Sequence, residues 1–177
     1  MSNDPVVSLR TFVPADAHGL YAQMHGPADV AWKQLDAPYF HAVEKAVSFG
    51  QFAEGFSAWC GQDDRQAILV DGQVVGLVNR CEEAPEGGGW WELGVVIFDP
   101  SLWRRGIGCA ALSQWIADTW RTTSANVLTL TTWSGNDGMI GLAQKVGFTE
   151  CGRVPNARLW KGRRWDSVTF ALARKGA

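Results

Sequence analysis

The sequence has no long apolar run and few of the residues that build metal sites or disulfide frameworks. No stretch approaches the roughly 18 apolar residues of a membrane-spanning helix, and the initial MSNDPVV lacks the basic and apolar regions of a secretory signal. The four cysteines, Cys60, Cys81, Cys109 and Cys151, fall in no ligand spacing, and the three histidines have no second group of ligands. We therefore expect a cytoplasmic protein with reduced thiols, no membrane association and no metal.

The sequence also has no excess of basic residues, with 16 Lys and Arg against 18 Asp and Glu. The formal net charge is -2 at pH 7, whereas proteins dedicated to DNA usually carry a clear basic excess, so we expect no direct DNA binding. The charge is nevertheless uneven along the chain. Residues 1–100 hold 5 Lys and Arg against 14 Asp and Glu, whereas residues 151–177 hold 7 basic residues and one acidic residue. This basic segment is either a solvated hairpin face or a surface for an acidic substrate.

The length suits one domain, which we expect to span residues 1–177 without internal repeats. Alternating apolar residues predict a strand at about residues 6–13, and Pro14 offers a helix start. Residues 29–59 place apolar side chains at intervals of three and four, which predicts helical structure interrupted at Pro38.

The clearest local signal is a hairpin. RQAILV and QVVGLVNR flank Asp71-Gly72, a dipeptide that supplies the positive φ angles of a tight primed turn. The remaining elements follow from periodicity and turn residues. They are a strand at 90–98, an amphipathic helix from Gly106, a strand at 126–132, a short helix after Asn136 that ends at Gly147, and a strand pair at 157–160 and 165–173. This order predicts a mixed α/β sandwich.

The stretch FDPSLWRRGIGCAALSQW joins the strand at 90–98 to the next helix. The first turn of a helix leaves backbone N–H groups without intrahelical partners and carries partial positive charge, so it favours an anion such as a phosphate. Gly106 and Gly108 would let the backbone approach such a ligand closely, and Arg104 and Arg105 add positive charge. The alternative is a plain turn.

Two other phosphate-binding motifs are excluded by their context. GIGCAA, residues 106–111, fits a dinucleotide fingerprint, but residues 99–105 separate it from its strand and NVLTLTTW offers no acidic residue for a ribose. A nucleotide-binding redox protein is therefore disfavoured. A Walker loop fails as well, because no Gly-Lys-Ser/Thr follows the glycines.

ELGVVIFDPSLWRRGIGCAAL, followed about 25 residues later by LTTWSGNDGMIGLAQKVGF, resembles the core of the GNAT superfamily of acyl-CoA-dependent N-acyltransferases. Together with ARLWKGRRWDSVTFALAR near the end, it is most similar to the branch that contains bacterial ribosomal-protein N-terminal acetyltransferases. The resemblance implies an α/β fold with a mixed, mostly antiparallel sheet flanked by helices. It also implies that acetyl-CoA is the co-substrate, that a primary amine accepts the acetyl group, and that a homodimer is compatible with the chain.

The resemblance also implies a set of cofactor contacts. Coenzyme A phosphates would bind the backbone of the glycine loop, the cofactor arm would lie along the strand before it, and an asparagine would contact that arm unless it is only a helix cap. By position these residues are Arg104, Arg105, Gly106, Ile107, Gly108 and Cys109 in the loop, Val95, Val96 and Ile97 in the strand, and Asn136.

Catalytic and acceptor residues follow from the same resemblance. Glu92 matches a position where a carboxylate acts as base, directly or through water, although it would equally pair with an arginine. The usual tyrosine acid corresponds to Ala143, so Ser134, Cys151 or water would protonate the leaving thiolate. In this branch the segment 29–59 covers the acceptor. It supplies three candidate contacts, Trp32, Asp36 and Tyr39.

The acceptor expected from the branch is the α-amine of a peptide or protein. A small-molecule amine acetyltransferase is the first alternative. The second is a catalytically weak acyl-CoA-binding module, which the missing tyrosine keeps open.

Overall fold

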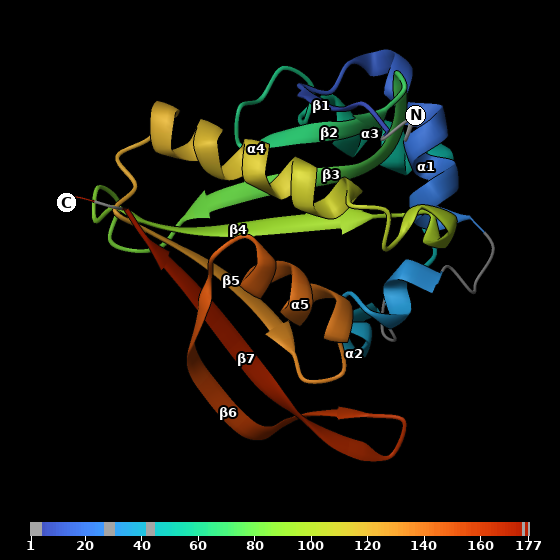
Figure 1. The fold of residues 1–177 in the computed structure, drawn as a ribbon. Helices are drawn as coiled ribbons and strands as arrows, with labels where there is room; N and C mark the ends of the chain where they lie inside the picture. Colours follow the sequence, from blue (N-terminus) through green and yellow to red (C-terminus); the bar gives the residue numbers. More distant parts are fainter. Residues whose placement is uncertain (1–4, 27–30, 42–44, 175, 177) are drawn as a thin grey trace.

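The computed structural model describes residues 5–26, 31–41, 45–174 and 176, and its centre is a seven-stranded sheet (Figure 1). In chain order the strands are β1 (Val7–Arg10), β2 (Arg65–Val70), β3 (Gln73–Glu82), β4 (Trp90–Ile97), β5 (Val127–Trp133), β6 (Thr149–Trp160) and β7 (Arg163–Ala173). Their order in the sheet is β1-β2-β3-β4-β5-β7-β6. All neighbours are antiparallel except β4 and β5, which are parallel. The predicted mixed, mostly antiparallel sheet is confirmed.

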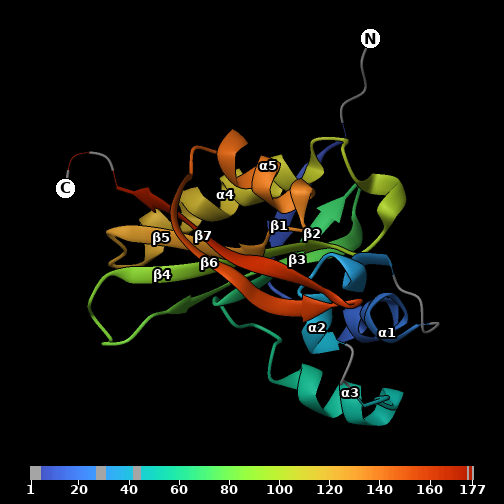
Figure 2. The ribbon, with the colours of Figure 1, turned by 90° about the horizontal axis from the view of Figure 1, so that it is seen from below.

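Helices cover both faces of the sheet. They are α1 (Ala17–His25), α2 (Pro38–His41), α3 (Phe49–Ser57), α4 (Ile107–Thr122) and α5 (Asp137–Lys145), with short 3-10 turns η1 (Pro14–Asp16), η2 (Ala31–Gln34) and η3 (Pro100–Leu102). Figure 2 shows α4 and α5 on one face and α1, α2 and α3 on the other. Within the described ranges, none of the helices is both long and apolar enough to cross a membrane.

Strand alternation in β4 supplies both hydrophobic cores. Leu93, Val95 and Ile97 pack in the core that surrounds α4, where Trp115 is fully buried. Val96 packs in the second core, under α1 and α3. Successive residues of a strand point to opposite faces, so one continuous apolar strand can serve both layers.

Turn residues fix the boundaries that were predicted best. Asp71 and Gly72 have φ angles of 49° and 81° and join β2 to β3, as expected for a primed turn. Gly147, at φ 97°, follows Val146, the C-cap of α5, at the position where a left-handed residue commonly ends a helix.

Three predicted elements differ from the structure. The first strand ends at Arg10 instead of residue 13, because its pairing with β2 stops at Ala67 and Phe12 instead makes an isolated parallel bridge to Cys60. The segment 29–59 contains only short helices, apart from residues 29, 30 and 42–44, which lie outside the described part. The final strands are longer than 157–160 and 165–173, and their hairpin extends beyond the body of the protein (Figure 1). The pairing register of β6 shifts between Val154 and Arg158, so its residues do not alternate regularly and a period-two pattern predicts only the end of the strand.

Candidate active site

β4 and β5 separate after a short parallel pairing. Their register covers only Trp90–Val127, Trp91–Leu128 and Glu92–Thr129. From Leu93 to Ile97, β4 keeps its antiparallel partner β3, while its other side faces a cavity of about 990 Å³. Backbone groups on an unpaired strand side can bind a ligand that carries amide groups of its own.

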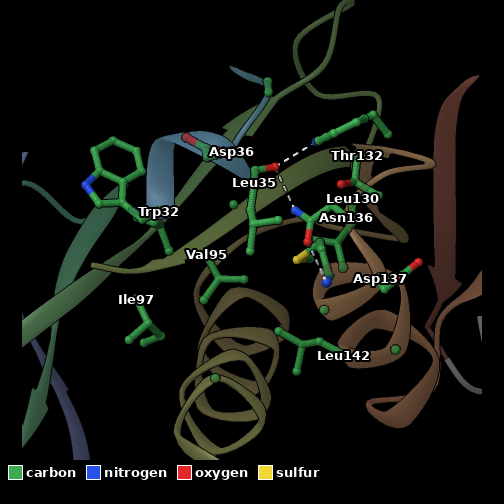
Figure 3. Close-up of a pocket in the computed structure, with 18 of the residues that line it drawn as sticks. Trp32, Leu35, Asp36, Val95, Ile97, Leu130, Thr132, Asn136, Asp137 and Leu142 are labelled. Atoms are coloured by element: carbon green, nitrogen blue, oxygen red, sulfur yellow. Dashed lines mark hydrogen bonds between the residues drawn. The ribbon is translucent and has the colours of Figure 1, made fainter. Parts of the chain in front are cut away.

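The cavity extends from the loop before α4 to the segment that contains η2 and α2. Val95, Ile97 and Leu142 line it from β4 and α5, and Asp36 lies at the opposite wall (Figure 3). Two parts of the chain that are far apart in sequence therefore share one cavity.

The loop before α4 has the geometry of an anion site. Arg104 and Gly106 both have left-handed φ angles, 61° and 81°, and no side chain of the described residues caps α4 at Gly106. A Cβ at Gly108 would meet only the Leu142 side chain, at 3.4 Å. The Trp103 indole donates to the carbonyl oxygen of Ile97 at 2.9 Å and so attaches the loop to the end of β4. The first-turn N–H groups of α4 and the open space at Gly106, where a Cβ would meet nothing within 4 Å, fit a diphosphate.

Most of the predicted cofactor residues do line this cavity. They are Val95, Val96, Ile97, Arg104, Gly106, Gly108, Cys109 and Asn136. Arg105 is exposed and lies outside the lining. The Ile107 side chain is 1% exposed and belongs to the core, so only its backbone is near the loop surface.

Asn136 connects the two ends of the cavity. Its Oδ1 accepts from the Met139 N–H at 3.0 Å, which caps α5, and its Nδ2 donates to the Leu35 carbonyl oxygen at 3.0 Å (Figure 3). The Trp133 indole donates to the same oxygen at 2.7 Å. A Cβ at Gly135 would lie 1.9 Å from the Trp133 ring, so glycine is required for this arrangement. The predicted helix cap is present, and Leu35, Trp133 and Gly135 are site residues that the sequence analysis missed.

The three predicted acceptor contacts line the other end of the cavity. Trp32 is 4% exposed and its indole donates to the Gln23 carbonyl oxygen at 3.1 Å, so it forms a fixed wall. The Asp36 carboxylate is half-exposed and lies 3.2 Å from Nε2 of His41. Burial raises the pKa of the Tyr39 phenol, although the cation of Arg158 opposes the shift.

Arg158 is a further cavity residue, contributed by β6. Its guanidinium carbon lies 5.0 Å from the centroid of the Tyr39 ring and 5.4 Å from that of Phe40. The basic charge of residues 151–177 does not separate this arginine from the others on the hairpin. The signal that could have located it is Pro155-Asn156, a pair typical of bulges and turns, which interrupts β6 just before Arg158 with Asn156 at a φ of 56°.

The two predicted catalytic side chains lie outside the cavity lining. The Glu92 carboxylate, at the last β4–β5 pair, accepts a hydrogen bond from the Thr129 hydroxyl, which in turn accepts from the Trp90 indole at 2.8 Å. The Ser134 hydroxyl accepts from the Asp166 N–H at 2.9 Å. Both catalytic roles therefore stay predictions.

Two further features of the described residues bear on the chemistry of the site. Ala143, where the family tyrosine was expected, is fully buried in the core. Among the side chains that the structure describes, no group of three or more His, Cys, Asp and Glu residues is arranged to hold a metal ion.

Comparison with protein families decides the class of enzyme. The acetyltransferase (GNAT) domain matches residues 7–149. This chain belongs to the GNAT acetyltransferase family. The resemblance seen in the sequence is confirmed at this level, and the protein is an acetyl-CoA-dependent N-acyltransferase.

Solved structures agree with this GNAT fold. A putative acetyltransferase from Salmonella typhimurium, with its cofactor acetyl-CoA, is 19% identical, with a TM-score of 0.70 over 97% of this chain and 95% of that chain. RimL, a ribosomal α-N-protein acetyltransferase in complex with coenzyme A, is 14% identical, with a TM-score of 0.75 over 94% and 93%. A spermidine N-acetyltransferase chimera, from Vibrio cholerae and hSSAT, is 16% identical, with a TM-score of 0.70 over 94% of this chain and 95% of that chain. At these identities the likeness shows the fold and does not single out the ribosomal-protein branch.

Among curated protein sequences, none matches the chain significantly. The acceptor therefore has to be argued from the site.

Proposed function

We propose that this GNAT enzyme transfers the acetyl group of acetyl-CoA to the α-amine of a peptide or protein, by direct attack within a ternary complex. The observation that carries the proposal is the single cavity that runs from the glycine loop to η2 and α2. One cavity of this extent can hold the acyl donor and the amine side by side, which direct transfer requires.

The residues at the α4 end suit coenzyme A. The backbone N–H groups at the start of α4 would hold its diphosphate, and Arg104 and Lys145, which both line the cavity, add positive charge. The unpaired side of β4 from Leu93 to Ile97 would bind the amides of the pantetheine arm. Acetyl-CoA supplies the activated acyl group as a thioester.

An α-amine suits this site because few side chains near the cavity can act as a general base. At pH 7.4 an α-amine with a pKa of about 7.8 is neutral roughly a quarter of the time, whereas a lysine amine with a pKa of about 10.4 is neutral about one time in a thousand. In the described cavity wall the carboxylates are Asp36 and Asp137, and Glu92 lies at the point where β4 and β5 separate. An acceptor that loses its proton readily asks least of these groups.

We assign the role of base to Glu92. Because this residue lies outside the cavity lining, it would act through a water molecule. Its hydrogen bond from Thr129 would hold the carboxylate in one orientation. A backbone N–H near Val96 would stabilise the oxygen of the tetrahedral intermediate, where negative charge develops.

We favour Tyr39 over Ser134 as the proton donor to the leaving thiolate. Ser134 lies outside the cavity lining, whereas Tyr39 is part of the cavity wall. The raised pKa of Tyr39 keeps the phenol protonated across neutral pH. A thiol with a pKa of about 8.5 leaves with only modest help, so either donor would contribute less than the base.

The test is an acceptor screen that measures thiol release with N-terminal peptides, polyamines and aminoglycosides. We expect turnover with peptides and little with the small amines. The likeness to a spermidine acetyltransferase and the half-exposed Asp36 carboxylate make a small cationic amine the second candidate. Thiol release with polyamines and inert peptides would establish that alternative. Acetyl-CoA binding without release by any acceptor would identify a binding module.

A further inference from the structure

We propose that Arg158 determines which amines the enzyme accepts, by binding a carboxylate that the acceptor carries close to its amine. The inference rests on the function proposed above and makes it more specific. The substrate class becomes an acidic peptide N-terminus or a free amino acid, and polyamines are excluded because they carry no anion.

Arg158 reaches the acceptor end of the cavity from the edge of the sheet. β6 pairs only with β7, and most of its residues are exposed, but Arg158 is half-buried and lines the cavity. The rings of Tyr39 and Phe40, on α2, lie 5.0 and 5.4 Å from its guanidinium carbon. Contact with aromatic rings stabilises a cation in this position without neutralising it.

The Arg158 cation has no counter-ion within the described ranges. Its Nε atom is buried without a hydrogen-bond partner. None of the ion pairs among the described residues includes it. Arg153, on the same strand, is instead paired with Glu150 at 2.7 Å and Asp166 at 2.8 Å. A buried donor without a partner costs free energy, so an anion brought by the acceptor would be bound favourably.

A carboxylate suits this place better than a phosphate. A guanidinium binds a carboxylate through two parallel N–H···O bonds. The Asp36 carboxylate lines the same end of the cavity, where it attracts an ammonium group and repels a dianion more than a monoanion. Asp36 and Arg158 together therefore suit a molecule with one positive and one singly negative group.

The experiment compares acceptors that differ in one charge, by thiol release at saturating acetyl-CoA. Ala-Glu-Ala amide against Ala-Gln-Ala amide tests a side-chain carboxylate, and alanine against alaninamide tests a free α-carboxylate. For the wild type we expect kcat/KM to be higher by about tenfold or more for the acid of at least one pair. In Arg158→Gln the preference should fall below about twofold, while the affinity for acetyl-CoA stays unchanged.

Arg163→Gln is the matched control. Arg163 is on the same hairpin, and its guanidinium carbon lies 4.1 Å from the Trp165 ring centroid, outside the cavity lining. The variant removes this cation and should keep the preference for the acidic acceptor. Arg158→Lys retains the charge without the guanidinium fork and should keep a reduced preference, which tests the proposal even if Arg158→Gln unfolds.

Each other outcome is decisive. Peptide turnover with equal rates for both members of each pair would overturn the carboxylate assignment and leave peptide acetylation intact. A preference that survives in Arg158→Gln would assign recognition to another residue. Turnover of spermidine with peptides and alanine inert, or no turnover of any acceptor, would overturn the proposed acceptor class together with this inference.

Discussion

The side-chain amide of Asn136 donates to the carbonyl oxygen of Leu35, 101 positions earlier in the chain, at 3.0 Å. The same side chain caps α5 through the Met139 N–H. Asn136 therefore fixes the segment that contains η2 and α2 relative to α5.

Replacing Asn136 separates these two tasks. We expect Asn136→Ala to lower the free energy of unfolding by about 1 kcal/mol through the lost cap and to raise KM for the acceptor. Asn136→Asp keeps the capping oxygen but places a carboxylate oxygen against the Leu35 carbonyl oxygen, so it should raise KM at least as much as Asn136→Ala although the cap is retained. Urea unfolding and steady-state kinetics measure the two effects. An unchanged KM in both variants would show that the Leu35 contact has no part in acceptor binding.

Gly108→Glu places bulk and negative charge in the proposed diphosphate site. We expect the affinity for acetyl-CoA to fall by at least about 100-fold, because the juxtaposition of like charges costs several kcal/mol. Gly108→Ala is the control, since its Cβ would meet only the Leu142 side chain at 3.4 Å. Calorimetric titration measures both affinities. Unchanged affinity in a folded Gly108→Glu variant would refute the loop assignment.

Glu92→Gln removes the proposed base and keeps an oxygen that can accept from Thr129. We expect a folded protein with normal acetyl-CoA affinity and a kcat lower by about 100-fold. Glu86→Gln, which changes an exposed loop carboxylate, should leave kcat unaltered. A loss below about threefold in Glu92→Gln would give Glu92 a structural role only.

Tyr39→Phe tests the phenol both in catalysis and in stability. We expect a reduced kcat with little change in acetyl-CoA affinity. Because burial raises the pKa of Tyr39, the folded state favours the protonated phenol, and this contribution to stability is lost as the pH rises through the range above about 10. Unfolding free energies measured from pH 8 to 11 should therefore fall more steeply for the wild type than for Tyr39→Phe. Parallel curves would contradict the assignment of a buried phenol.

Boundaries of turns and helices were predictable where a single residue type favours one backbone conformation. The left-handed backbone positions fall at Asp71-Gly72, Gly106 and Gly147. Because residues of these types favour that conformation, the turn, the loop and the helix end could each be predicted from one or two residues. The GNAT resemblance then singled out residues of β4 and of the loop before α4, most of which line the cavity.

The cavity wall at η2 and α2 was only partly predictable, because it is assembled from segments that are distant in sequence and meet only in the folded protein. Tyr39 lies far upstream of Asn136, yet both residues line one cavity. Arg158 follows a register shift in β6 at Pro155 and Asn156, and such an irregularity breaks the period-two pattern from which the facing of a strand residue is predicted.

The short β4–β5 register has a mechanical consequence. Three residue pairs are the whole of the strand pairing between β1–β4 and β5–β7, so beyond Glu92 and Thr129 no strand hydrogen bonds join these two parts of the sheet. A ligand in the cavity would contact both parts, because residues of β4 and of β5 line it. Substrate occupancy would then set how tightly the two halves of the protein are held together, and stability would rise with the ligand concentration relative to its Kd.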